Sequence, residues 1–182
     1  MPDEKSTDDQ LMARIASGDQ DAFSQLVGKY QRQLLNFFLR MGAHMDEAED
    51  LTQETFLRLY AYRRSYEASS RFTSFLYVLA RHARADMLRK SKRSTEIGTE
   101  NLELAADDST PHDRKTEAKL DVTQALATLS EKLRPVVILA VFQGLDYQQI
   151  GEVLEIPLGT VKSRMHLAMR ALREALHVRA GE

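Results

Sequence analysis

The sequence predicts an all-α protein in which two small helical domains are joined by a flexible acidic linker. Apolar residues recur at helical spacing along most of the 182 residues, and only eight glycines and four prolines interrupt them. No alternating run of strand length is present. The stretch 94–115 has hardly any aromatic residues and many acids, so it cannot build a core. We therefore expect domains at 7–93 and 116–179, with the linker between them.

Four helices are expected in the first domain. The first six residues are polar and are expected to be disordered, and Thr7 can cap a short helix that Gly18 ends. A long helix follows from about Asp19, and Gly42 suits its C-terminal stop. A third helix is expected over 46–62 and a fourth over 72–90, with a loop at 63–71 between them.

The second domain is expected to end in a helix-turn-helix. Helical periodicity resumes near 116, and another helix is expected over 130–142. Asp146 followed by Gln149 resembles a capping box and begins a short helix. Pro157 breaks that helix, because proline lacks a backbone N–H and restricts its predecessor. A longer helix then runs from about 158 to 178.

This last helix has two distinct faces at 100° per residue. Five residues form an apolar stripe: Val161, Met165, Ala168, Leu172 and Leu176. Five polar residues gather on the other side: Lys162, Ser163, His166, Arg170 and Arg173. From 157 to 179 there are five Lys or Arg and one Glu. A basic second helix after a tight turn favours DNA binding in the major groove, although an ordinary helical hairpin shows the same pattern.

The third helix predicts a protein-binding surface. Its inner side is expected to hold Leu51, Thr55, Leu59 and Tyr62. Its other side groups apolar residues with acids and an amide: Asp50, Gln53, Glu54, Leu57 and Tyr60. An exposed leucine and tyrosine ringed by polar groups is typical of an interface. The alternative is a helix buried on two sides.

The fourth helix and the loop before it predict a surface for single-stranded DNA. The core stripe is expected to be Phe72, Phe75, Leu76, Leu79, Ala83 and Met87. Opposite it are expected Tyr77, Arg81, Arg84 and the basic cluster 89–93. The loop adds Tyr62, Arg63, Arg64, Tyr66 and Arg71. Bases with interleaved aromatic rings can hold a sugar-phosphate strand and stack an unpaired base, whereas the alternative is a solvated helix face.

Composition excludes several other functions. The net charge of −2 argues against a simple electrostatic nucleic-acid binder, although charge is segregated, with six bases and one acid over 81–93. Cysteine is absent, so thiol chemistry and cysteine-based zinc sites are excluded. The acids over 46–50 lack the spacing of known metal motifs, and we expect no metal or cofactor. The polar start and the lack of a long apolar run predict a cytoplasmic protein without membrane insertion.

Three motifs, in order, resemble those of the extracytoplasmic-function sigma factors of the sigma-70 superfamily. Asp46-Glu-Ala-Glu-Asp-Leu-Thr-Gln-Glu-Thr-Phe56 is similar to the polymerase-clamp helix, and 72–93 to the promoter-melting segment. The stretches 144–151 and 156–164 are similar to the −35-reading helix-turn-helix. The resemblance spans about 9–176. It departs from the family at Phe75, where tryptophan is common, at His82, where asparagine is common, and at Leu129-Ser130, where leucine-proline is usual.

The resemblance implies a function and the residues that perform it. The domain at 7–93 would be sigma region 2 and the domain at 116–179 sigma region 4. Core polymerase would bind Asp50, Gln53, Glu54 and Leu57. The −10 element would contact Arg63, Arg64, Tyr66, Arg71, Tyr77, Arg81, Arg84 and Arg89. The −35 element would contact Thr160, Lys162, Ser163, Arg164, His166 and Arg170.

The implied mechanism is non-enzymatic. The protein would bind core RNA polymerase, recognise promoter DNA, help to open the duplex and leave after synthesis begins, and an anti-sigma factor is a further possible partner. One alternative is a stand-alone helix-turn-helix regulator, which would bind an operator without polymerase. The other is a nuclease using the acids at 46–50, but the sequence contains no catalytic motif in its support.

Overall fold

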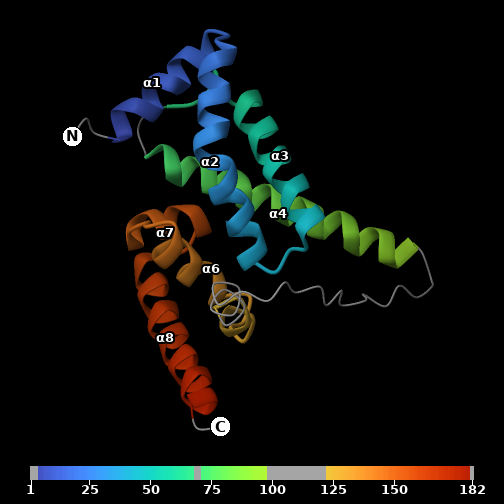
Figure 1. Cartoon of the computed structure of the whole chain (residues 1–182), viewed down its shortest axis with the longest axis vertical. Helices are drawn as coiled ribbons and strands as arrows, with labels where there is room; N and C mark the ends of the chain where they lie inside the picture. The colour runs from blue at the N-terminus through green and yellow to red at the C-terminus, as the bar shows by residue number, and fades with distance from the viewer. Residues whose placement is uncertain (1–3, 68–70, 98–121, 181–182) are drawn as a thin grey trace.

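The structure is a computed structural model that describes residues 4–67, 71–97 and 122–180. Within these ranges every regular element is a helix and none is a strand. Figure 1 shows the two groups of helices that the sequence predicts. Of the expected linker, residues 98–115 lie outside the described residues, as does the expected start of the second domain.

The first group contains α1 (Glu4–Ala16), α2 (Gln20–Arg40), α3 (Met45–Ala61) and α4 (Phe72–Ile97). Asp19 caps α2 by accepting a 3.0 Å hydrogen bond from the backbone N–H of Ala22. Gly42 follows α2 with a φ of +92°, a conformation that glycine adopts without strain. Two expected bounds are wrong. The first helix begins three residues before Thr7, and α4 continues past 90 because no glycine or proline occurs before Gly98.

The second group begins with helical residues 122–127 and continues with α6 (Arg134–Val137), η1 (Ile138–Phe142), α7 (Tyr147–Leu154) and α8 (Leu158–Ala180). The expected single helix over 130–142 is instead a turn, a short α-helix and the π-helical segment η1. Arg134 supports this turn by donating to the carbonyls of Leu126, Ala127 and Leu129 at 3.0–3.1 Å. The Leu126 and Ala127 carbonyls end the helical segment 122–127, where a cation is favourable.

The two groups are packed against one another. α4 contacts α7, and α2 contacts η1, so one hydrophobic core runs through both. In Figure 1, α7 lies beside the first half of α4, while α8 extends away from the first group. Elements that are far apart in the sequence therefore cover the face of α4 that the sequence pattern predicts to be exposed.

Candidate nucleic-acid and protein interfaces

The predicted helix-turn-helix is formed by α7 and α8. Asp146 accepts a hydrogen bond from the backbone N–H of Gln149 at 2.9 Å, and the Gln149 side chain accepts one from the Asp146 N–H at 2.9 Å. This reciprocal pair is the capping box that the sequence predicts. It fixes the start of α7, which is buried against α8 through Ile150 and Val153.

The turn between these helices depends on two residues before the proline. Glu155 has a φ of +54°, in the left-handed region, and the chain reverses there. The Ile156 N–H donates to the Gly151 carbonyl at 3.0 Å, and a Cβ on Gly151 would lie 3.0 Å from the Ile156 carbonyl oxygen. Pro157 stands at the start of α8, where its carbonyl accepts from the N–H of Val161 at 3.1 Å. A side chain at 151 would therefore crowd the turn.

The faces of α8 agree with the angular prediction. Val161, Met165 and Ala168 are buried, and Leu172 is partly buried against the core. The expected recognition residues Lys162, Ser163, His166 and Arg170 are all exposed. Thr160 and Arg164 are half-buried, so they lie closer to the body of the domain. Leu176 lies among the residues whose side chains are not described. This helix can thus place four polar side chains in a groove without disturbing its packing.

The expected protein-binding face of α3 is also accessible. Leu57 is 66 % exposed, and Asp50 and Gln53 are exposed on the same side. Glu54 is paired with Arg58 at 2.7 Å, and Arg58 also contacts Asp86 of α4 at 2.8 Å. An exposed leucine between carboxylates and an amide can be buried by a partner protein. The ion pairs of Arg58 connect α3, which carries this leucine, to α4.

Two tyrosines at the end of this helix and just after it differ from the prediction. Tyr62 is 54 % exposed rather than inward, because α3 ends at 61 and the chain turns there. Tyr60 is partly buried rather than exposed, with its ring 5.2 Å from that of Phe23. The Arg63 guanidinium lies 3.9 Å from the centre of the Tyr60 ring and donates to the Tyr60 carbonyl at 2.6 Å. Much of the Arg63 side chain is therefore engaged within the protein.

Tyr66 is likewise anchored. Its ring packs against Phe75 at 5.1 Å and Phe72 at 6.2 Å between centres, and its hydroxyl donates to Asp9 at 2.6 Å. Burial, and then the bond to Asp9, raises the pKa of the Tyr66 hydroxyl, so it stays protonated as a donor. Periodicity contains no signal for Asp9, which sequence reasoning missed. Tyr66 therefore fixes the loop after α3 to α1.

The expected positions of Tyr77 and Arg84 on an exposed face are wrong. Tyr77 is 1 % exposed, and its hydroxyl donates to the Gln143 side chain. Arg84 is half-buried and donates to the Met41 carbonyl at 3.3 Å, and burial lowers its pKa. Arg81 is half-buried and pairs with Glu155 at 2.5 Å. The angular count located the core of the first group correctly but could not show that a second group covers the opposite face.

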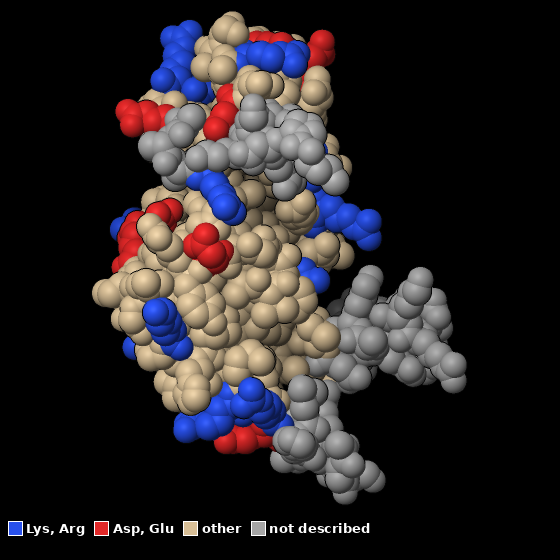
Figure 2. Space-filling view, turned by 90° about the vertical axis from the view of Figure 1, so that its left-hand side faces the viewer, with Lys and Arg blue, Asp and Glu red and all other residues tan. Residues whose placement is uncertain are grey.

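Other basic residues of the expected −10 surface are accessible. Arg64, Arg71 and Arg89 are exposed, although Arg89 is paired with Asp86. Hydrogen bonds from Arg89 and then Arg58 lower the pKa of the Asp86 carboxyl, so it stays ionised. Figure 2 shows one side of the molecule, on which Lys and Arg side chains form separate groups with acidic and other residues between them. Among the described residues visible on that side, the basic side chains do not form one continuous stripe.

Neither a metal-binding cluster nor a membrane-spanning helix is found among the described residues. Over 4–67, 71–97 and 122–180, no three His, Asp or Glu side chains are gathered so that they could hold a metal ion. Among the helices of these same ranges, none combines the length and apolar character needed to cross a membrane.

Comparison with protein families gives two matches within the chain. Residues 26–94 match the family described as Sigma-70 region 2, and residues 119–172 match Sigma-70, region 4. The ECF RNA polymerase sigma factor SigW of Bacillus subtilis is 35 % identical over 174 residues, which cover 90 % of this chain and 93 % of that protein. The RNA polymerase sigma-H factor of Pseudomonas aeruginosa is 32 % identical over 180 residues, covering 93 % of each.

Solved structures show the same fold. CnrH, in complex with the cytosolic domain of CnrY, superposes with a TM-score of 0.74 at 22 % identity, covering 94 % of this chain and 98 % of that one. The sigma factor RpoE of Bartonella quintana, in complex with the anti-sigma factor NepR, gives 0.68 at 26 % identity, covering 86 % and 97 %.

Proposed function

The chain belongs to the extracytoplasmic-function sigma factors of RNA polymerase and directs transcription initiation, and from this premise we propose how its two halves divide the work. The first half binds core polymerase and the −10 element, and the second half binds the −35 element. The observation that carries this division is the pair of separate surfaces, an exposed apolar one on α3 and an exposed polar one on α8.

Core polymerase binds the face of α3 formed by Asp50, Gln53, Glu54 and Leu57. Leu57 supplies apolar area that a partner can bury, and the polar residues form the rim. This face remains accessible although the two halves are packed together, so a large partner can reach it.

The −35 element is read by α8. Lys162, Ser163, His166 and Arg170 reach base edges or nearby phosphates from its exposed side, because they lie between the fifth and thirteenth residues of the helix. Thr160 and Arg164, which are half-buried, hold the phosphate backbone.

The −10 element is held by exposed basic residues before α4 and along it. Arg64, Arg71 and Arg89 are accessible to phosphates. Arg63 and Tyr66 are held by contacts within the protein and form part of the same surface. Arg81, Arg84 and Tyr77 can take part only after the second half has moved away from α4.

The remaining features of the function follow from the family. We infer that the protein catalyses no reaction of its own, needs no cofactor, and works in the cytoplasm where RNA polymerase acts. Because RpoE of Bartonella quintana is seen with an anti-sigma factor, we propose a protein inhibitor of this kind as a second partner.

Reconstitution with core polymerase tests the proposal. The purified chain and core enzyme are incubated with fragmented DNA from the source genome, and the starts of the transcripts are sequenced. We expect starts that share −10 and −35 elements and that disappear without this chain. A stand-alone regulator would instead bind its operator tightly without polymerase and would leave the starts unchanged, which would overturn the proposal.

A further inference from the structure

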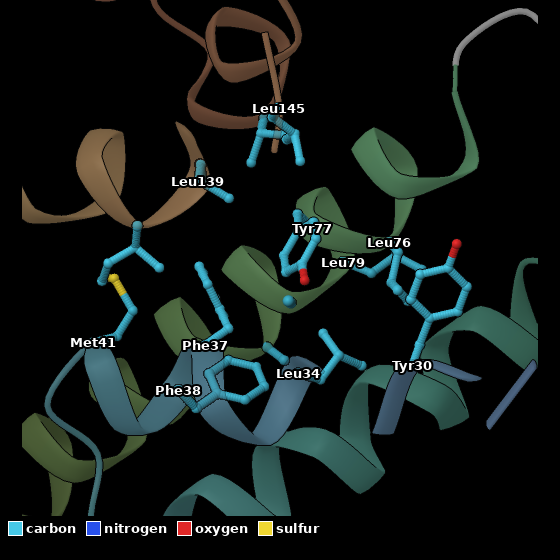
Figure 3. Close-up of a cluster of buried hydrophobic side chains, with 14 of the residues drawn as sticks. Tyr30, Leu34, Phe37, Phe38, Met41, Leu76, Tyr77, Leu79, Leu139 and Leu145 are labelled. Carbon is cyan, nitrogen blue, oxygen red and sulfur yellow. The ribbon is translucent and has the colours of Figure 1, made fainter. Parts of the chain in front are cut away.

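The recognition helix carries an exposed leucine that packing within the protein does not explain. Buried leucines such as Leu34, Leu76 and Leu139 belong to the apolar cluster that Figure 3 shows. Leu167 of α8 is instead 42 % exposed. Among the described residues, it belongs neither to the hydrophobic core nor to the partly buried residues packed against that core. Much of its side chain is therefore available to a molecule that binds α8.

Leu167 lies between two residues that we assign to the −35 element. At 100° per residue, it is about 40° around the helix axis from Ser163, one turn earlier, and about 60° from Arg170, one turn later. Both neighbours are exposed. The Ser163 hydroxyl already donates to the Thr160 carbonyl at 3.1 Å, so it offers an acceptor to DNA, whereas Arg170 offers donors. Leu167 offers neither.

A side chain without hydrogen-bonding groups fits one kind of base edge in the major groove. Guanine, cytosine and adenine present acceptors and amino donors there, and thymine adds an apolar C5-methyl group. A leucine placed over a donor or acceptor would exclude water from it without replacing the lost hydrogen bond, which is unfavourable. A leucine placed over the methyl group removes apolar surface of both from water, which is favourable.

We propose that Leu167 is a specificity-determining residue for the −35 element, and that it contacts the methyl group of one thymine. It thereby selects an A·T pair at a step between those that Ser163 and Arg170 reach. This inference rests on the proposed function, because it takes α8 as the helix that enters the major groove at the −35 element.

Met169 provides a matched control on the same helix. It is 37 % exposed, which is close to the value for Leu167, and it too is absent from the residues packed against the core. It lies one turn after the buried Met165 and one turn before the half-buried Leu172, so it borders the apolar stripe of α8. A contact that depends on the position of Leu167, and not only on exposed apolar surface, should be absent at Met169.

Replacing thymine by deoxyuridine tests the contact, because the two bases differ only in the C5-methyl group. The holoenzyme formed from the full chain and core polymerase is bound to a promoter that it transcribes, with each −35 thymine replaced in turn on either strand. We expect one replacement to weaken binding roughly threefold to fivefold, the effect of losing about one buried methyl group. If every thymine can be replaced without loss, or if the preferred −35 element contains none, the proposal is wrong.

Protein variants show whether Leu167 is the residue that detects this methyl group. With Leu167→Ala, the same replacement should have no further effect, because the contact is already lost. Leu167→Met keeps a similar side-chain volume and should keep most of the response, and Met169→Ala should keep all of it. A full response to deoxyuridine in the Leu167→Ala holoenzyme would assign the methyl group to another residue and so overturn the proposal.

Replacing the whole −35 element by an unrelated sequence separates this outcome from a failure of the proposed function. If the wild-type holoenzyme then binds as well as before, α8 reads no −35 element, and the role proposed for the second half fails together with that of Leu167. If binding depends on the element but on no thymine methyl group, α8 reads the element and only the role of Leu167 is refuted.

Discussion

The hydroxyl of Tyr66 donates a 2.6 Å hydrogen bond to the carboxylate of Asp9, which lies 57 residues earlier in the chain. The bond joins α1 to the loop between α3 and α4. The Tyr66 ring also packs against Phe72 and Phe75 at the start of α4. The first helix therefore helps to position a loop that we assign to the −10 element.

Removing this hydrogen bond is expected to destabilise the first half. Tyr66→Phe keeps the ring and loses the hydroxyl, so a part-buried carboxylate loses its partner, which costs about 1–2 kcal/mol in the free energy of unfolding. Tyr62→Phe removes a hydroxyl from a ring that is 54 % exposed and is the control. Urea unfolding followed by circular dichroism provides the comparison, and equal midpoints would contradict a structural role for the bond.

Leu57→Glu is expected to weaken core polymerase binding. A leucine that becomes buried in a complex contributes about 1.5–3 kcal/mol, so the dissociation constant should rise roughly tenfold to a hundredfold. Gln33→Glu, on an exposed position of α2, adds a similar charge elsewhere. Competition for core enzyme against the wild-type chain measures the effect, with helicity checked for both variants. If the Leu57 variant competes as well as wild type, the partner binds another face.

The recognition helix is expected to separate two kinds of contact. Lys162→Ala and Arg170→Ala should change which −35 sequences are transcribed, because a lost base contact costs about 1–3 kcal/mol at its own step. Arg164→Ala should lower transcription from all promoters alike, since this half-buried residue is assigned to a phosphate. Transcription from a library of −35 variants measures the ranking. Identical rankings for all three variants would mean that the helix positions the protein without reading sequence.

Gly151→Ala is expected to destabilise the helix-turn-helix. The new methyl group would lie 3.0 Å from the Ile156 carbonyl oxygen, and relieving that contact requires the turn to shift, at a cost of about 1–3 kcal/mol. Gly159→Ala is the matched substitution in α8, where a methyl group meets nothing within 4 Å. It should stabilise the helix by up to about 1 kcal/mol. Thermal unfolding of both variants tests this, and a Gly151 variant as stable as wild type would refute the close approach.

Local patterns predicted much of this fold. The capping box at Asp146 and the stripe through Val161, Met165 and Ala168 were predicted because they depend on residues within a few turns of one another. The accessible Leu57 followed from the same angular reasoning.

Contacts between distant segments were not predictable in this way. Helical periodicity reveals one buried face of α4 and so predicts that Tyr77 is exposed, whereas its face is covered by residues more than sixty positions later. Glu155 and Asp9 also have partners that are distant in the sequence. Nothing in the local sequence around either residue indicates these partners. The most useful additional signal would have been the charge match between Arg81 and Glu155, once the two halves were brought together.

The π-helical segment η1 gives this part of the chain one position at which its length can change. A π turn contains one more residue than an α turn and makes about the same rotation. Deleting one residue from 138–142 would therefore allow a regular helix to form while the residues after it keep nearly their present direction. A deletion inside α4 would instead rotate every later residue of that helix by about 100°. Single-residue deletions should therefore be tolerated better within 138–142 than within α4.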